Sequence, residues 1–260
     1  MKKQLVISVS LLFLWLYSRA APSDTTIYGV PVYFSYTDSP FPAEWQAAPI
    51  SATAVKMDVA EISRCKTVMT TALKKYPEEV LQINLKALYF FKSISFYNVG
   101  YGGTNSTDML YLTNNGNAMG YTNSYLEQTF HHEFSSILFR NYPALLDTVS
   151  WKNANVAGFD YNDPEAGVGA IRNKQSSQEP DTALCSKGFL TQYACSSLEN
   201  DVNTIAQNLF RPDEKFWVFA DLYPRIRKKV SLLISFYRNI SAVFTEQYFR
   251  KFDTKLLFSD

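Results

Sequence analysis

The stretch from residue 124 to residue 141 constrains the fold more than any other part of the chain. Its apolar residues recur every three or four positions, which is the spacing of one face of an α-helix. They are Leu126, Phe130, Phe134, Ile137 and Leu138. Ser124 and Glu127 match a capping box, and Pro143 would stop the helix. The sequence therefore predicts a helix over 124–141 that packs one face into a core.

The same stretch contains the only two histidines of the chain, His131 and His132. His132 and Glu133 begin a zinc-hydrolase motif, in which a second histidine four residues later binds the same metal and the glutamate activates the metal-bound water. Here Ser136 occupies the second ligand position, and a neutral hydroxyl is a poor zinc ligand. His131 cannot replace it, because adjacent helical residues point about 100° apart. A solvated polar helix face explains the same residues without a metal.

The N-terminus is typical of a secretory signal peptide over residues 1–20. Lys2 and Lys3 precede an apolar run that is too short for a confident membrane span, and small residues precede the expected cleavage site. An uncleaved anchor is the alternative. Cleavage would remove three basic residues and no acidic one, which turns the formal net charge from +1 to −2. We therefore expect an exported periplasmic or cell-surface protein with no affinity for nucleic acid.

Three cysteines are present, at positions 65, 185 and 195. In an exported protein Cys185 and Cys195 could close a short disulfide loop, which would leave Cys65 as a buried thiol. The alternative is three reduced, buried cysteines. The spacing excludes a CxxC zinc site.

The remaining pattern predicts an α+β fold. Residues 21–56 form an N-terminal strand and linker segment, and residues 57–260 form the main domain. Strands are expected over 25–38, 92–106 and 108–115. Helices are expected from Asp58, from Pro77 as far as Leu88, over 198–210 and 213–222, and after Pro224. Residues 144–183 are the least periodic part and are expected to form a long surface excursion with short elements.

Three segments resemble a family of exported bacterial zinc-binding metallopeptidases of the gluzincin type. They are "FHHEFSSIL", "WKNANVAGFDYND" and "GFLTQYACSSLENDVNTIAQNLF". The resemblance covers roughly residues 57–245, and its motifs are specific together and weak singly. It implies a zincin-like fold, in which a small twisted sheet precedes the histidine helix and a helical part follows.

The resemblance also implies roles for particular residues. His132 matches the first zinc ligand, Glu133 matches the general base, and Tyr193 matches the tyrosine that stabilises the oxyanion. The second histidine of the family corresponds to Ser136, and the ligand glutamate corresponds to Asn200. Two of the three expected metal ligands are therefore replaced, and His132 would be a vestigial ligand.

Three functions stay open at this stage. The first is a catalytically degenerate peptidase that binds a peptide, a glycan or an envelope partner and needs no cofactor. The second is an active zinc hydrolase that uses His132, Glu133 and a carboxylate from Glu199 or Asp201. The third is an unrelated exported α+β binding domain, which a large separation between His132 and Tyr193 would favour.

Overall fold

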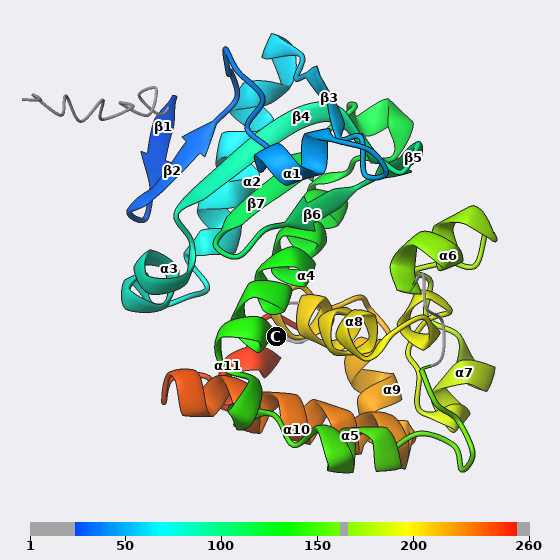
Figure 1. Ribbon diagram of the computed structural model, residues 1–260. Helices are drawn as coiled ribbons and strands as arrows, with labels where there is room; N and C mark the ends of the chain where they lie inside the picture. The colour runs from blue at the N-terminus through cyan, green and yellow to red at the C-terminus, as the bar shows by residue number, and fades with distance from the viewer. Residues whose placement is uncertain (1–23, 162–165, 254–260) are drawn as a thin grey trace, which may run out of the picture.

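The computed structural model describes residues 24–161 and 166–253, so the predicted signal peptide lies outside the described residues. Seven strands form one mixed sheet (Figure 1). They are β1 (Thr25–Ile27), β2 (Val30–Tyr33), β3 (Thr53–Lys56), β4 (Ala87–Phe96), β5 (Val99–Tyr101), β6 (Gly103–Asn105) and β7 (Met109–Thr113). Strands β1, β2 and β3 come from the N-terminal segment 21–56. This segment is therefore hydrogen-bonded into the same sheet as β4 to β7.

β4 is the central strand of the sheet. It pairs in parallel with β2 and β7, and antiparallel with β3 and β5. Its inward and outward residues are both buried, because helices cover one face and an aromatic cluster around Phe41 and Trp45 covers the other. β6 pairs antiparallel with β7 and ends the main order β1-β2-β4-β7-β6. Its other edge pairs with none of the strands in the described part of the chain.

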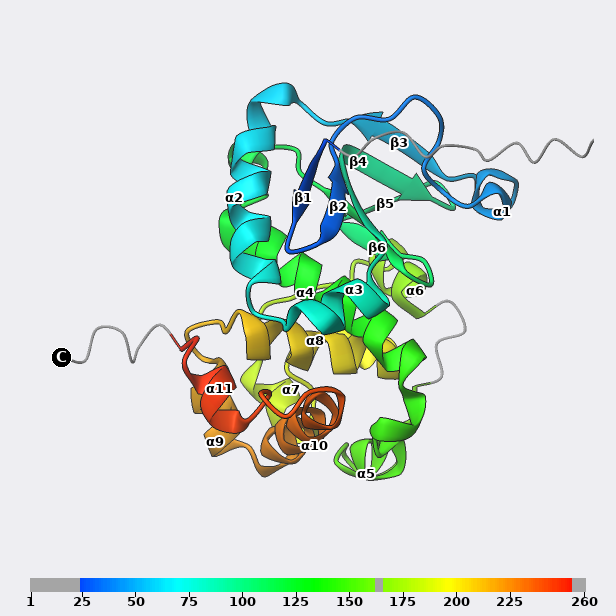
Figure 2. The same cartoon turned by 90° about the vertical axis from the view of Figure 1, so that its left-hand side faces the viewer.

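The helices lie behind the sheet and in a separate helical half (Figures 1 and 2). The α-helices are α1 (Ala43–Gln46), α2 (Ile62–Leu73), α3 (Glu78–Asn84), α4 (Asn123–Asn141), α5 (Thr148–Asn153), α6 (Ala166–Arg172), α7 (Thr182–Lys187), α8 (Leu198–Phe210), α9 (Phe216–Leu222), α10 (Pro224–Ile240) and α11 (Glu246–Arg250). The short 3-10 turns are η1 (Val59–Glu61), η2 (Asn117–Met119), η3 (Pro143–Leu145) and η4 (Tyr193–Cys195). This arrangement confirms the predicted α+β fold.

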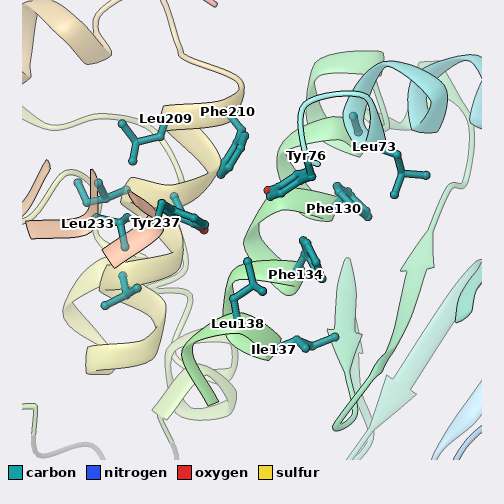
Figure 3. Packing of buried hydrophobic residues seen from close by; sticks show 14 of the residues in the cluster. Leu73, Tyr76, Phe130, Phe134, Ile137, Leu138, Leu209, Phe210, Leu233 and Tyr237 are labelled. Atoms are coloured by element: carbon teal, nitrogen blue, oxygen red, sulfur yellow. The ribbon is translucent and has the colours of Figure 1, made fainter. Parts of the chain in front are cut away.

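α4 connects the two halves of the molecule, because it is buried on both sides (Figure 3). Phe130, Phe134 and Ile137 point toward the sheet, while Phe210 and Tyr237 lie on the helical side. The alternative of a solvated polar face on this helix is therefore wrong, because His132 is 8% exposed and Ser136 is 2% exposed. The partner that covers this face is α8.

The start of α4 also differs from the prediction. Thr122 is the N-cap, and its hydroxyl accepts a hydrogen bond from the Tyr125 amide. Ser124 already lies inside the helix. Glu127 cannot reach back to the cap because its carboxylate is buried against Lys75 and Arg211, at 2.6 Å and 3.3 Å. Two buried ion pairs thus outweigh a local capping contact.

Two further predictions need correction. Leu88 lies in β4 and not in the second helix, because a short apolar run buried on both sides has no distinguishing period. The expected strand over 92–106 is divided into the end of β4, β5 and β6, and the β4–β5 turn is formed by Tyr97 and Asn98, both at positive φ. Gly102 lets a helix approach, because a Cβ at this position would lie 1.9 Å from the Tyr125 hydroxyl.

The segment 144–183 contains the expected short elements, namely α5, α6 and the start of α7. It does not lie entirely on the surface, because Trp151 on α5 is among the largest fully buried side chains. The cysteines at 65, 185 and 195 are all free, so the disulfide between Cys185 and Cys195 is not formed; Cys65 and Cys185 are buried and Cys195 is half-buried. None of the described helices is both long and apolar enough to span a membrane.

Candidate functional site

α4 and α8 run side by side in opposite directions and are joined by three polar side-chain pairs. His132 contacts Gln207, Ser136 contacts Asn203, and Arg140 contacts Glu199. Each step of four residues forward on α4 is matched by a step of four residues back on α8, as expected for antiparallel helices whose facing residues recur every turn. We call these three pairs the polar ladder.

The first pair of the polar ladder fixes the hydrogen-bonding role of Nδ1 in His132. This atom lies 2.8 Å from the amide oxygen of Gln207. Because an amide oxygen can only accept, Nδ1 donates the hydrogen. The ring lines the pocket described below.

The second pair of the polar ladder occupies the side chain at the second ligand position. Asn203 donates through Nδ2 to Ser136 Oγ over 2.6 Å, and both residues are almost fully buried. Asn200, the position carried over from the family resemblance, instead donates to Ser196 Oγ over 2.8 Å. The α8 side chains that face His132 and Ser136 are therefore Gln207 and Asn203.

Glu133 is held between the helix and the sheet edge. Asn105 on β6 donates to its carboxylate over 2.5 Å, and Arg140 donates to the Asn105 side-chain oxygen. The Arg140 guanidinium also contacts Glu199 at 3.1 Å. Burial raises the pKa of Glu133 above its ordinary value, while His132 and the Asn105 hydrogen bond oppose this rise. The carboxylate is thus positioned by Asn105 of β6.

Tyr193 lies on η4, beside His132. The two ring centroids are 6.0 Å apart, with an interplanar angle of 29°. Burial, reinforced by the nearby charge of Glu133, raises the pKa of Tyr193, so its hydroxyl stays protonated. α6 covers this hydroxyl closely, because a Cβ on Gly167 would lie only 2.5 Å from it. The structure therefore brings His132, Glu133 and Tyr193 together.

These three residues line one pocket of about 320 Å³, which is bordered by β5, β6, α4, α6, η4 and α8. The described lining residues are Gly100, Tyr101, Gly102, Gly103, Tyr125, Gln128, Thr129, His132, Glu133, Ile171, Ser176, Gln178, Tyr193 and Gln207. Ser136 and Asn200 are not among them. The volume is at the lower end of the range for small-ligand sites.

The donor atoms of the site do not fit a zinc ion. His132 supplies one imidazole nitrogen and Glu133 one carboxylate, whereas zinc sites use three or four protein ligands. The carboxylate of Glu199 is bound to Arg140, and that of Asp201 accepts hydrogen bonds from Lys229 and Trp151. Within residues 24–161 and 166–253, no three His, Cys, Asp or Glu side chains form a metal-binding group.

Asn203 and Gln207 were not singled out from the sequence. Their four-residue spacing matches the spacing between His132 and Ser136, and this is the signal that could have indicated them. The matching spacing identifies these residues only if α4 and α8 are known to pack antiparallel. A single sequence does not show which helices pack together.

In its fold the chain is similar to a solved structure from Bacteroides caccae described as a "putative zinc-binding metallo-peptidase". The TM-score is 0.56 and the identity 16%, and the match covers 86% of this chain and 83% of that chain. No family model and no curated protein sequence matches the chain. The likeness establishes a metallopeptidase-like fold, and a shared fold alone does not carry an activity.

Proposed function

We propose that this chain is an exported metallopeptidase-like protein whose site binds a peptide and does not perform metal-dependent hydrolysis. One observation carries the proposal: the two α8 residues that face His132 and Ser136 are the neutral amides Asn203 and Gln207. A neutral amide adds no negative charge that would favour Zn²⁺, and the hydroxyl of Ser136 is already bound. The site would thus retain its shape while lacking the ligands for the metal.

The position of β6 supports a peptide as the ligand. This short strand borders the pocket through Gly103, and its outer edge is unpaired with respect to the described strands. An extended peptide can add to such an edge through main-chain hydrogen bonds. A glycan or a folded envelope protein would be the alternative partners, and both belong in the same binding experiment.

The second candidate function is an active zinc hydrolase. It is supported by the shared pocket of His132, Glu133 and Tyr193. Its weakness is that Glu199 and Asp201, the carboxylates it requires, are held by Arg140 and Lys229. The unrelated-domain hypothesis is less well supported, since His132 and Tyr193 are in ring contact.

A peptide library tests the proposal by measuring binding and hydrolysis in the same samples, with and without added zinc. We expect binding to the wild-type protein and no cleavage under either condition. Chelator-sensitive cleavage that disappears in Glu133→Gln would contradict the proposal and support the active alternative. Glu179→Gln is the matched control, because it removes the same charge from an exposed position next to Gln178 of the pocket.

Export is the second part of the proposal. The basic start and apolar run of residues 1–20 support it. Expression of the full chain in a bacterial host, followed by fractionation and N-terminal sequencing, tests it. A mature N-terminus close to residue 21 in the exported fraction is expected, and an intact Met1 in the cytosolic fraction would contradict it.

A further inference from the structure

We infer that the pocket recognises a positively charged amine, supplied by a peptide N-terminus or a lysine side chain. This inference rests on the proposed peptide-binding function and specifies which chemical group the pocket would select. It is carried by three features of the lining: its charge, its aromatic rings and the polarity of its hydrogen-bonding atoms.

The charge of the pocket is negative. Glu133 is the only acidic residue among the described lining residues, and none of them is lysine or arginine. Three cations lie nearby and each has a partner: Arg140 contacts Glu199, Arg211 contacts Glu127, and Arg172 donates to the Tyr97 carbonyl. A cationic ligand would be attracted by the Glu133 carboxylate in this partly buried setting, whereas an anionic ligand would be repelled by it.

Aromatic rings add to this preference. Tyr101, Tyr125 and Tyr193 all line the pocket and come from three different elements. The face of a tyrosine ring attracts a cation through its quadrupole, and a combination of aromatic rings is a common way to bind ammonium groups. Tyr101 is supported from behind by Phe96, with ring centroids 5.4 Å apart, so its ring is held in place.

Several side chains of the lining can accept a hydrogen bond. Asn105 donates to one oxygen of Glu133, which leaves the other oxygen for a ligand. Gln128 uses its amide nitrogen on the Arg211 carbonyl, so its remaining hydrogen-bonding atom is the amide oxygen, an acceptor. The tyrosine hydroxyls of the lining can accept as well as donate. An ammonium group has three N–H donors and no acceptor, so it can use these acceptors.

Four matched tripeptide amides test the inference by calorimetric titration of the full mature protein. The first has a free N-terminus and a central norleucine, so its only cation is the terminal amine. The second is N-acetylated with a central lysine, so its only cation is the side chain. The third is N-acetylated with norleucine and is neutral, and the fourth is N-acetylated with glutamate and is anionic. The first two arms distinguish the two sources of the amine.

We expect at least one amine peptide to bind about 10- to 100-fold more tightly than the neutral peptide, as for a hydrogen bond to a charged group. Glu133→Gln should reduce this ratio to about twofold or less, while Glu179→Gln should preserve it. Equal binding of the amine and neutral peptides, or an amine preference that survives in Glu133→Gln, would overturn the inference and leave the proposed peptide binding intact. Absence of binding for all four peptides at millimolar concentration would contradict both.

Discussion

Asn203 donates a hydrogen bond to Ser136 across the α4–α8 interface, one helical turn from the bond between Gln207 and His132. In this arrangement a hydroxyl and two amides hold the helices together where a metal site would need a histidine and a carboxylate. The hydroxyl at residue 136 and the imidazole at residue 132 therefore both face neutral amides on α8. This pairing is the physical basis of the proposed loss of metal chemistry.

The Asn203–Ser136 pair should contribute to stability. Ser136→Ala leaves the buried Asn203 amide without its acceptor, so we expect the free energy of unfolding to fall by about 1–3 kcal/mol. Urea unfolding measures this change. Adding Asn203→Leu to Ser136→Ala should recover part of the loss, because both polar groups are then removed. Ser231→Ala, an exposed serine on α10, is the control and should cost less than about 0.5 kcal/mol. A loss no larger than in this control would contradict the pairing.

The ion pair between Lys229 and Asp201 should be the most sensitive charge interaction in the helical half. Both side chains are fully buried, and Lys229 Nζ lies 2.5 Å from Asp201 Oδ2. Lys229→Met would leave the carboxylate buried and unpaired, which costs about 3–5 kcal/mol. Lys228→Met, on the exposed side of the same helix, should change thermal unfolding little. Similar melting temperatures for both variants would show that the buried Asp201 carboxylate does not need Lys229 for the stability of the fold.

Stability should decrease in acid through His131 and Glu127. Burial lowers the pKa of His131 to about 4 from an ordinary value of 6.5. Burial alone would raise the pKa of Glu127, but contact with His131 and the charge of Lys75 lower it to about 2 from 4.5. Both folded-state values lie below the unfolded ones, so the unfolded chain binds more protons.

The contribution of His131 is therefore complete above about pH 6.5 and is lost as the pH falls to about 4. That of Glu127 is lost between about pH 4.5 and 2. Urea midpoints measured from pH 8 to 4 should decline in the first window. The decline should be smaller in His131→Gln, which has no titrating ring. An unchanged slope in this variant would contradict the assignment to His131.

The fold could be predicted in outline because periodic apolar residues report directly on buried helix faces. The prediction of a helix over 198–210 matches α8. The prediction for 124–141 gave the body of α4 but not its cap, because the long-range ion pairs of Glu127 override the local capping pattern. Local signals cannot report such competition from residues far away in sequence.

The candidate site could be predicted in part for a related reason. His132, Glu133 and Tyr193 were identified through motifs, and all three line one pocket. Asn203 and Gln207 escaped because amides carry no catalytic signal, and their importance arises only from the register between two helices. That register depends on how the intervening 56 residues between α4 and α8 fold, which sequence spacing does not encode.

Placing a histidine at residue 136 and a glutamate on the facing turn of α8 should create a metal site. Because Asn203 faces Ser136, we expect the double variant Ser136→His with Asn203→Glu to bind zinc in the micromolar range or better. Ser136→His with Asn200→Glu is the comparison, since Asn200 donates to Ser196 instead. Metal titration against a coloured zinc indicator measures both. Tighter binding by the Asn200 variant would place the lost ligand one turn earlier on α8.

Zinc binding by the purified wild-type protein tests the central claim most directly. Metal content after dialysis against trace zinc, followed by competition titration, gives both stoichiometry and affinity, and the Ser136→His with Asn203→Glu variant serves as the positive control. We expect substoichiometric zinc and a Kd weaker than about 1 μM for the wild type, because one imidazole and one carboxylate cannot complete a zinc site. One tightly bound zinc ion per wild-type chain, lost in a His132→Ala variant, would contradict it.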